Sequence, residues 1–235
     1  MRKMSLKNAI ALFMAIVMPL IFYFIVSSIL NKQSSDFEIR TLPTFYEEPI
    51  RDFTLYSHVG DTINRDSLKG KIVISEFFFT TCPGICPVMI GQMLRVQDFL
   101  LNHPGLRQQY QILSITVDPT NDSISRLKEY ATENKVDGSL WWMLTGDKEE
   151  IYDLARNHYY VTAMEDPSGE SQDGFFIHSD RFILKDKKGF IRGYYRGTDS
   201  LEVTNLMDDI LQLEIEYEKE MIRDRKVEVR VTEDN

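Results

Sequence analysis

An unbroken apolar run lies near the start of the chain. Residues 9–30 hold 22 consecutive uncharged positions, and a helix of that length would reach ~33 Å, enough to cross a hydrocarbon core of ~30 Å. A cleaved secretory signal normally has a shorter apolar region, of about 7 to 15 residues. The run therefore predicts one transmembrane helix that stays in the protein and anchors it in the membrane.

Charge on either side of this run predicts its orientation. Arg2, Lys3 and Lys7 precede it, so the positive-inside tendency places residues 1–8 in the cytoplasm and everything after the helix on the periplasmic or extracytoplasmic side. We expect a single-pass plasma (inner) membrane protein.

A polar segment of residues 31–49, with two prolines and neither helical nor strand period, predicts a tether. From residue 50 the pattern alternates between strands and helices. The expected strands include 68–80, 110–117, 140–144, 175–184 and 190–195, and the expected helices include 87–101, one through Leu127 and Ala131, one capped by Asp147, and one through Leu206 and Ile210. Residues 214–235, with eight acids and five bases, predict a solvated helix end followed by disorder.

Alternation of strands and helices with a closing hairpin at residues 186–189 (DKKG) predicts a three-layer α/β sandwich with a mixed central sheet over residues 50–213. The length of 235 residues fits one such domain with appendages. The net charge of −9 argues against an electrostatic grip on nucleic acid.

Candidate chemistry gathers in the segment FFFTTCPGICPVM, which holds the only two cysteines of the chain, Cys82 and Cys86. The segment joins an expected central strand to an expected helix that begins after Pro83 or Pro87, where a helix dipole would favour thiolates. Three interpretations compete: a structural disulfide, which would close only a short loop; a redox dithiol, although three residues separate the cysteines instead of the usual two; and a site for a soft metal ion such as Cu(I).

A metal site needs a third donor besides the two sulfurs, and the chain offers four histidines. His58 lies in an expected turn and His103 at an expected helix end, so both should face solvent, whereas His158 continues an apolar helical stripe and should pack. His178 lies in the strand-like run FFIHSDRFIL. On spacing alone it is either an ordinary strand histidine or the third donor.

Three segments together resemble the Sco/SenC family, membrane-anchored copper proteins of thioredoxin-like fold that serve cytochrome c oxidase assembly. They are DFTLYSHVGDTINRDSLKGKIVISEFFFTTCPGICP, ITVDPTND and IHSDRFILKDKKGFIRGYYRG, and the resemblance covers about residues 51–199. It implies a copper site formed by Cys82, Cys86 and His178, for Cu(I) with Cu(II) as a second option. It also implies a metallochaperone, rather than an enzyme, that delivers copper to the binuclear centre of cytochrome c oxidase subunit II or another respiratory copper protein.

The sequence departs from the family pattern beside the expected ligands. Gly84 and Ile85 stand where many members have an acid, and Ile177 stands where many have Asp before the histidine; Asp118 and Asp180 are candidate substitutes in the surroundings of the metal. Two alternatives stay open, a thiol-disulfide oxidoreductase that uses the Cys82–Cys86 pair and a copper or redox sensor. The upstream copper donor is unassigned.

Overall fold

The structure is a computed structural model that describes residues 17–24, 26–27, 40–103, 105, 108–161, 163–165, 175–177 and 179–233. It divides into two compact units, residues 1–40 and residues 41–235. In the first unit, residues 17–24 and 26–27 are helical. No helix within the described part of the chain is both long and apolar enough to cross a membrane. The expected transmembrane run of residues 9–30 lies partly outside the described residues.

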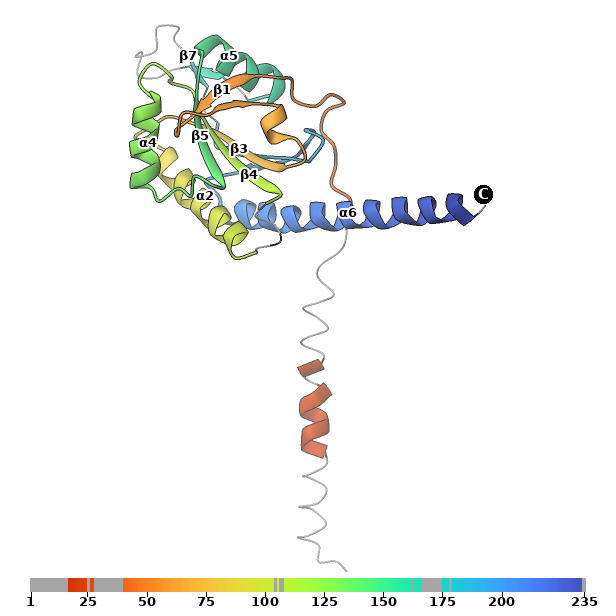
Figure 1. Ribbon diagram of the computed structural model, residues 1–235. Coiled ribbons are helices and arrows are strands. Elements are labelled where there is room, and N and C mark those ends of the chain that lie inside the picture. The colour runs from red at the N-terminus through yellow and green to blue at the C-terminus, as the bar shows by residue number, and fades with distance from the viewer. Residues whose placement is uncertain are drawn as a thin grey trace, which may run out of the picture. The chain divides into compact units, whose positions relative to one another are not determined.

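A mixed sheet forms the centre of the second unit (Figure 1). Within the described residues, seven strands follow the order β2-β1-β5-β4-β3-β8-β9. β3, β4 and β5 run parallel, and the outer strands join them antiparallel. The strands are β1 (Thr54–Ser57), β2 (Thr62–Asn64), β3 (Ile72–Phe78), β4 (Tyr110–Thr116), β5 (Trp141–Thr145), β8 (Arg181–Lys185) and β9 (Ile191–Arg196). The predicted mixed sheet is confirmed.

Helices cover both faces of this sheet. The central strand β3 is buried along its whole length, because its alternate side chains enter two separate apolar cores. One core lies beneath α2 (Cys86–Leu101), α4 (Ile124–Glu133) and α6 (Ser200–Glu233), and the other beneath η1 (Asp66–Leu68), α5 (Lys148–Asp153) and the π-helical η2 (Leu154–His158). Figure 1 shows α2 and α6 on one side of the strands and α5 on the other. This is the three-layer sandwich expected from the sequence.

The strand predicted over residues 175–184 is divided in two. β7 (Phe175–Ile177) pairs with β6 (Ala163–Glu165) in a separate two-stranded sheet, whereas β8 joins β3 in the main sheet. The polar residues 178–181 (HSDR) separate the two apolar groups, and the sequence analysis continued one strand across them. The predicted hairpin between β8 and β9 is confirmed, and Gly189 supplies its positive φ of 90°.

Helix α6 continues to Glu233, so the disorder predicted for residues 214–235 is not found in the described residues. Tyr217 shows why the helix stays attached to the domain beyond Leu213. Its hydroxyl accepts the backbone N–H of Lys187 at 3.1 Å, and the Lys187 ammonium lies 4.6 Å from the centre of its ring. The tip of the β8–β9 hairpin therefore holds this part of α6.

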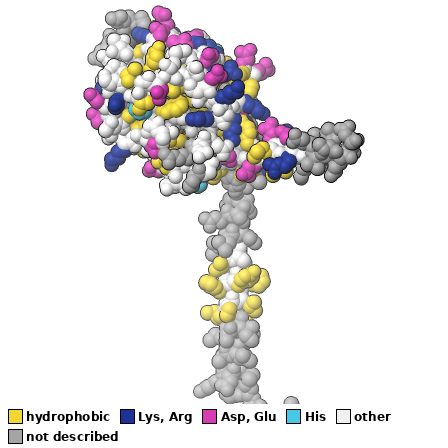
Figure 2. All heavy atoms as spheres, in the orientation of Figure 1, with side chains coloured by type: hydrophobic (Ala, Val, Ile, Leu, Met, Phe, Trp, Pro, Cys, Tyr) yellow, Lys and Arg dark blue, Asp and Glu magenta, His cyan; other side chains and the backbone are white. Residues whose placement is uncertain are grey.

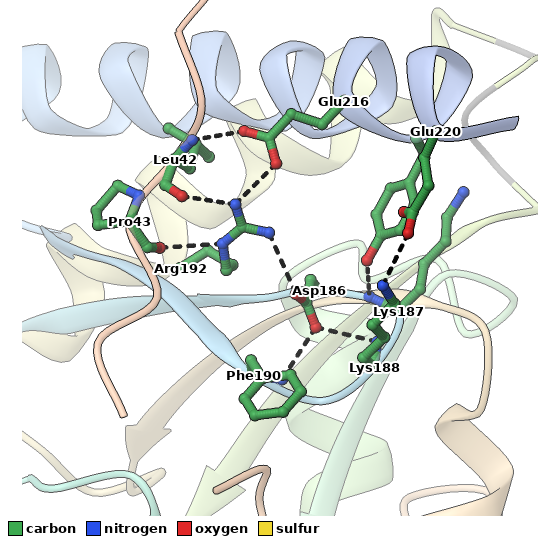
Figure 3. A network of polar contacts seen from close by, with 10 residues as sticks. Leu42, Pro43, Asp186, Lys187, Lys188, Phe190, Arg192, Glu216 and Glu220 are labelled. Carbon is green, nitrogen blue, oxygen red and sulfur yellow. Dashed lines mark hydrogen bonds and ion pairs between the residues drawn. The ribbon is translucent and has the colours of Figure 1, made fainter. Parts of the chain in front are cut away.

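A buried arginine fixes the segment before β1 to the domain (Figure 3). Arg192 is 7% exposed and pairs with Asp186 at 3.2 Å and with Glu216 at 2.7 Å. Its remaining N–H groups donate to the backbone carbonyls of Leu42 at 2.7 Å and Pro43 at 3.0 Å. The part of the predicted tether that follows residue 41 is thus bound to β9 and α6.

Candidate metal centre

Cys82 and Cys86 lie in the short connection between β3 and α2. Cys86 is the first residue of α2, and Pro87 occupies its first turn as the sequence predicts. The two thiols are 8% and 5% exposed and are not joined in a disulfide. The connection therefore presents two free sulfurs at the carboxyl end of the central strand, where α/β sheets commonly place their sites.

The two sulfurs are close neighbours. The Cys86 side chain is hydrogen-bonded to that of Cys82, and the backbone N–H of Phe79 also bonds to the Cys86 sulfur. Two soft donors held at hydrogen-bond distance suit a soft cation such as Cu(I). They equally suit the formation of a disulfide.

Burial raises the pKa of the Cys86 thiol, and the neighbouring Cys82 and Glu76 raise it further, whereas the Phe79 N–H lowers it. The prediction that the helix N-terminus keeps both cysteines as thiolates is therefore wrong for Cys86. Removal of the sulfur from water outweighs the favourable end of the helix dipole.

A buried carboxyl group lies on the same face of β3 as the thiols. Glu76 is 3% exposed and accepts a hydrogen bond from the Ser114 hydroxyl at 2.6 Å, which in turn accepts one from the Trp141 indole at 2.8 Å. Burial raises the pKa of Glu76 to about 7. The sequence analysis missed Glu76, although an acid inside the apolar run IVISEFF was a visible signal.

Helix α4 contributes an aromatic side chain to the same region. The Tyr130 ring lies 5.8 Å from that of Phe78, centre to centre. Burial raises the pKa of Tyr130 to about 12, and the charges of Cys86 and Glu76 add to the effect. The thiols, the buried carboxyl and this phenol therefore share one electrostatic environment.

Asp122 holds the strand end that leads into the cysteine segment. Its carboxylate accepts the backbone N–H of Thr80 at 3.1 Å, the Thr80 hydroxyl at 2.5 Å and the Thr116 hydroxyl at 2.5 Å. Asp122 is fully buried, so these bonds replace its hydration. It thereby fixes a residue two positions before Cys82. The sequence analysis missed Asp122, because an acid just before a helix cap usually faces solvent.

The predicted metal-ligand residues are only partly described. His178 lies outside the described residues. The Asp118 carboxylate accepts the Asn121 amide at 2.8 Å, and the Asp180 carboxylate pairs with Arg181 at 3.3 Å. No group of three or more His, Cys, Asp or Glu side chains arranged to hold a metal ion occurs among the residues that the structure describes.

The pairing of β8 with β3 shows at which end of the sheet β8 begins. β8 pairs antiparallel with β3, with Ser75 opposite Ile183 and Val73 opposite Lys185. The start of β8 therefore lies toward the carboxyl end of β3, from which the chain continues to Cys82. β8 therefore begins at the same end of the sheet as that at which β3 leads into the cysteine segment.

The other histidines have varied surroundings. His58 was predicted to face solvent, but it is 5% exposed and its Nδ1 accepts the backbone N–H of Met143 at 3.2 Å. Burial lowers its pKa. His103 is exposed as predicted, and His158 is partly buried, with Nε2 3.9 Å from the Asp153 carboxylate.

Comparisons with known proteins identify similar sequences and folds. The SCO1/SenC family model matches residues 43–213. The SCO1 protein homolog of Bacillus subtilis (strain 168) is 30% identical over 169 residues, covering 72% of this chain and 83% of that protein. BsSco, a member of the Sco family of cytochrome c oxidase assembly proteins with a disulfide switch, superimposes with a TM-score of 0.61 at 25% identity, covering 74% of this chain and 96% of its own. Arabidopsis thaliana ScoI with copper bound gives a TM-score of 0.57 at 26% identity, covering 70% of this chain and 99% of its own.

Proposed function

The chain belongs to the SCO1/SenC family, and on that premise we propose that it binds copper and delivers it to cytochrome c oxidase during assembly of that enzyme. The observation that carries the proposal is the pair of buried, unoxidised thiols of Cys82 and Cys86, held side by side between β3 and α2. Arabidopsis thaliana ScoI, which shares this fold, is solved with copper bound.

In this proposal Cys82 and Cys86 bind the copper ion as thiolates and His178 supplies the third donor through an imidazole nitrogen. Two sulfurs and one nitrogen form a soft donor set that suits Cu(I). Asp122 keeps the cysteine segment in place through Thr80. Asp118 and Asp180 serve as outer groups that orient the site, and the recipient is the binuclear copper centre of subunit II.

The experiment is a Cu(I) titration of the reduced, copper-free full chain against a chromogenic chelator, followed by X-ray absorption of the loaded protein. We expect one Cu(I) per chain with two sulfur donors and one nitrogen donor. His178→Ala should weaken binding at least tenfold and remove the nitrogen signal. His103→Ala is the matched control, since His103 is exposed and its ring bonds only to the Phe99 carbonyl among the described residues.

Two results would refute the copper proposal. One is the absence of stoichiometric Cu(I) uptake by the wild-type chain. The other is equal affinity in the wild type and His178→Ala, which would leave the two cysteines to act without that histidine.

The second candidate function is thiol-disulfide exchange, and the hydrogen bond between the two free thiols favours it. The Cys82 thiolate would attack a disulfide of the copper-site cysteines in the partner, and Cys86 would then resolve the mixed disulfide. Two electrons pass to the partner, which leaves with two thiols, and Cys82 and Cys86 become a disulfide. Trapping of a mixed disulfide by Cys86→Ser, together with unimpaired exchange in His178→Ala, would favour this function over copper delivery. A copper or redox sensor would show neither transfer.

The localisation is part of the proposal. We place residues 9–30 across the membrane, residues 1–8 in the cytoplasm and the α/β domain on the opposite side with the recipient. The full chain should then stay in the membrane pellet after alkaline carbonate extraction. Release into the supernatant would contradict the anchor.

A further inference from the structure

A pocket of about 380 Å³ opens between the start of β3, the β8–β9 hairpin and η1. We call it the Lys185 pocket. Its apolar wall is formed by Ile50, Phe53, Leu68 and Val73, all of which belong to the core beneath α5. Val73 lies at the amino end of β3, so the pocket is separated from the cysteine segment by most of that strand, or ~16 Å at 3.3 Å per residue.

Positive charge collects around this pocket in a chain whose net charge is −9. Six Lys or Arg residues line it, against three Asp residues. Figure 2 shows Lys and Arg side chains, with Asp and Glu side chains among them, on the flank of the domain beside α6. Arg65 and Lys69 are exposed, and neither side chain has an ionic partner within the described residues.

Two of the three acids of the pocket have hydrogen-bond or ionic partners of their own. Asp186 pairs with Arg192 and accepts the backbone N–H groups of Lys188 and Phe190 at 3.0 and 2.9 Å. The Asp52 carboxylate accepts the backbone N–H groups of Phe53 at 3.0 Å and Arg65 at 3.1 Å.

Lys187 and Lys188 also pair outside the pocket, with Glu214 at 3.9 Å and Glu220 at 3.1 Å. The positive surplus of the pocket therefore comes from the four other cations, Arg65, Lys69, Lys71 and Lys185, which exceed the two remaining acids, Asp52 and Asp66.

The most unusual group is Lys185 itself, at the end of β8. It is 2% exposed, its Nζ donates a hydrogen bond to the Tyr159 hydroxyl, and it lies 4.4 Å from the centre of the Tyr159 ring. That hydroxyl is in turn hydrogen-bonded to Ser75 at 3.1 Å. Both neighbours are neutral, and no carboxylate pairs with Lys185 in the part of the chain that the structure describes. Buried charges in proteins are normally paired, so an ammonium group here lacks a counter-charge.

We propose that the Lys185 pocket binds a small organic anion, whose phosphate or carboxylate group pairs with Lys185 and the cationic rim and whose apolar part lies on Phe53 and Val73. The anion supplies the counter-charge that the fold does not. The volume lies within the range of small-molecule sites, about 300 to 1,000 Å³. This site is independent of the copper chemistry of Cys82 and Cys86.

The test uses phenyl phosphate, an aromatic ring with one phosphate group, and the copper-free full chain in zwitterionic phosphatidylcholine nanodiscs. Isothermal titration at pH 7 should show one phenyl phosphate bound per chain. Lys185→Met should weaken binding at least tenfold, and the double variant Arg65→Gln/Lys69→Gln should weaken it severalfold without touching the core. Phenol, which lacks the phosphate, should not bind at the same concentrations.

The matched control is Lys128→Gln/Lys219→Gln, which removes two exposed positive charges outside the pocket and should bind phenyl phosphate like the wild type. Equal affinity in the wild type and Lys185→Met would overturn the proposal, as would equal binding of phenol and phenyl phosphate. A loss of affinity in this control as large as in the rim variant would also overturn it, because the attraction would then be a general effect of charge.

Replacing part of the phosphatidylcholine by phosphatidylglycerol separates two sources of the anion. Competition with phenyl phosphate would identify a lipid headgroup as the ligand, and unchanged binding would identify a soluble organic anion. Both results retain the Lys185 pocket as the site.

Discussion

Replacing Lys185 by methionine should make the protein more stable, against the usual expectation for a core substitution. Methionine keeps a flexible, unbranched side chain of similar length, and the Tyr159 hydroxyl retains Ser75 as a partner at 3.1 Å. Burial lowers the pKa of Lys185 from 10.5 to about 7, and each unit of such a shift corresponds to about 1.4 kcal/mol. The cost of burying the ammonium is therefore of the order of 5 kcal/mol at low pH.

The sign of the pH dependence follows from the direction of this pKa shift. Between pH 7 and 10.5 the unfolded chain binds a proton at Lys185 that the folded chain does not, so this lysine makes wild-type stability rise with pH in that window. Below pH 7 both states are protonated and the cost is complete. Lys185→Met should thus gain about 5 kcal/mol over the wild type at pH 6 but only about 2 kcal/mol at pH 9.

The assay is urea unfolding of the full chain in mild detergent at pH 6, 7.5 and 9. It can be followed by tryptophan fluorescence, since Trp141 is fully buried and reports on the core. Lys219→Met is the control, because Lys219 is exposed on α6, and it should change the free energy of unfolding by less than about 0.5 kcal/mol. The reasoning is refuted if the difference between Lys185→Met and the wild type stays constant from pH 6 to pH 9.

Three further substitutions test other buried polar groups. Glu76→Gln should leave the free energy of unfolding unchanged below pH 4.5 and raise it by about 3 kcal/mol above pH 7, because the pKa of Glu76 rises from 4.5 to about 7 on folding. Urea unfolding of the copper-free chain at pH 4 and pH 8 measures this difference. Equal gains at the two pH values would contradict the prediction. Asp122→Ala removes three hydrogen bonds to Thr80 and Thr116, so it should lower the free energy of unfolding by about 3 kcal/mol. It should also speed the reaction of Cys82 and Cys86 with a thiol reagent. Unchanged reactivity would show that Asp122 does not hold the cysteine segment. Arg192→Met leaves the carboxylates of Asp186 and Glu216 without their partner, so it should lower the free energy of unfolding by about 3 to 5 kcal/mol. Lys188→Met breaks the exposed pair with Glu220 and should lower it by less than about 1 kcal/mol. Similar losses in both variants would contradict the role of burial.

Much of the sheet could be predicted because its strands carry their own signals. The run Ile72–Phe78 is apolar and rich in β-branched and aromatic residues, and such a run is typical of a strand covered on both faces. The placement of Cys82 and Cys86 followed from that strand and the prolines beside them. Asp147 was correctly assigned as a helix cap, since its side chain accepts the N–H of Glu150 at 3.0 Å.

What the sequence analysis missed depends on contacts between distant parts of the chain. His58 is buried because β5 supplies Met143, a residue 85 positions away, as its hydrogen-bond donor. Asp122 and Lys185 carry charges that usually face water, and only the assembled sheet shows that they do not. The break between β7 and β8 falls at the polar residues 178–181, but the change of partner strand from β6 to β3 depends on contacts that the local pattern does not specify.

Strand β3 links the two buried titratable groups. Glu76 lies on one of its faces, and Lys185 bonds to Tyr159, whose hydroxyl is hydrogen-bonded to Ser75 on the other face. As pH rises from 4.5 to 7, the unfolded chain loses the Glu76 proton that the folded chain keeps, so stability falls. From pH 7 to 10.5 the folded chain has lost the Lys185 proton that the unfolded chain keeps, so stability rises. Together these two groups make their smallest contribution to stability near pH 7. This minimum follows from the burial of one acid and one base in the same fold. An anion in the Lys185 pocket should therefore stabilise the fold most near and below pH 7, where Lys185 carries its charge.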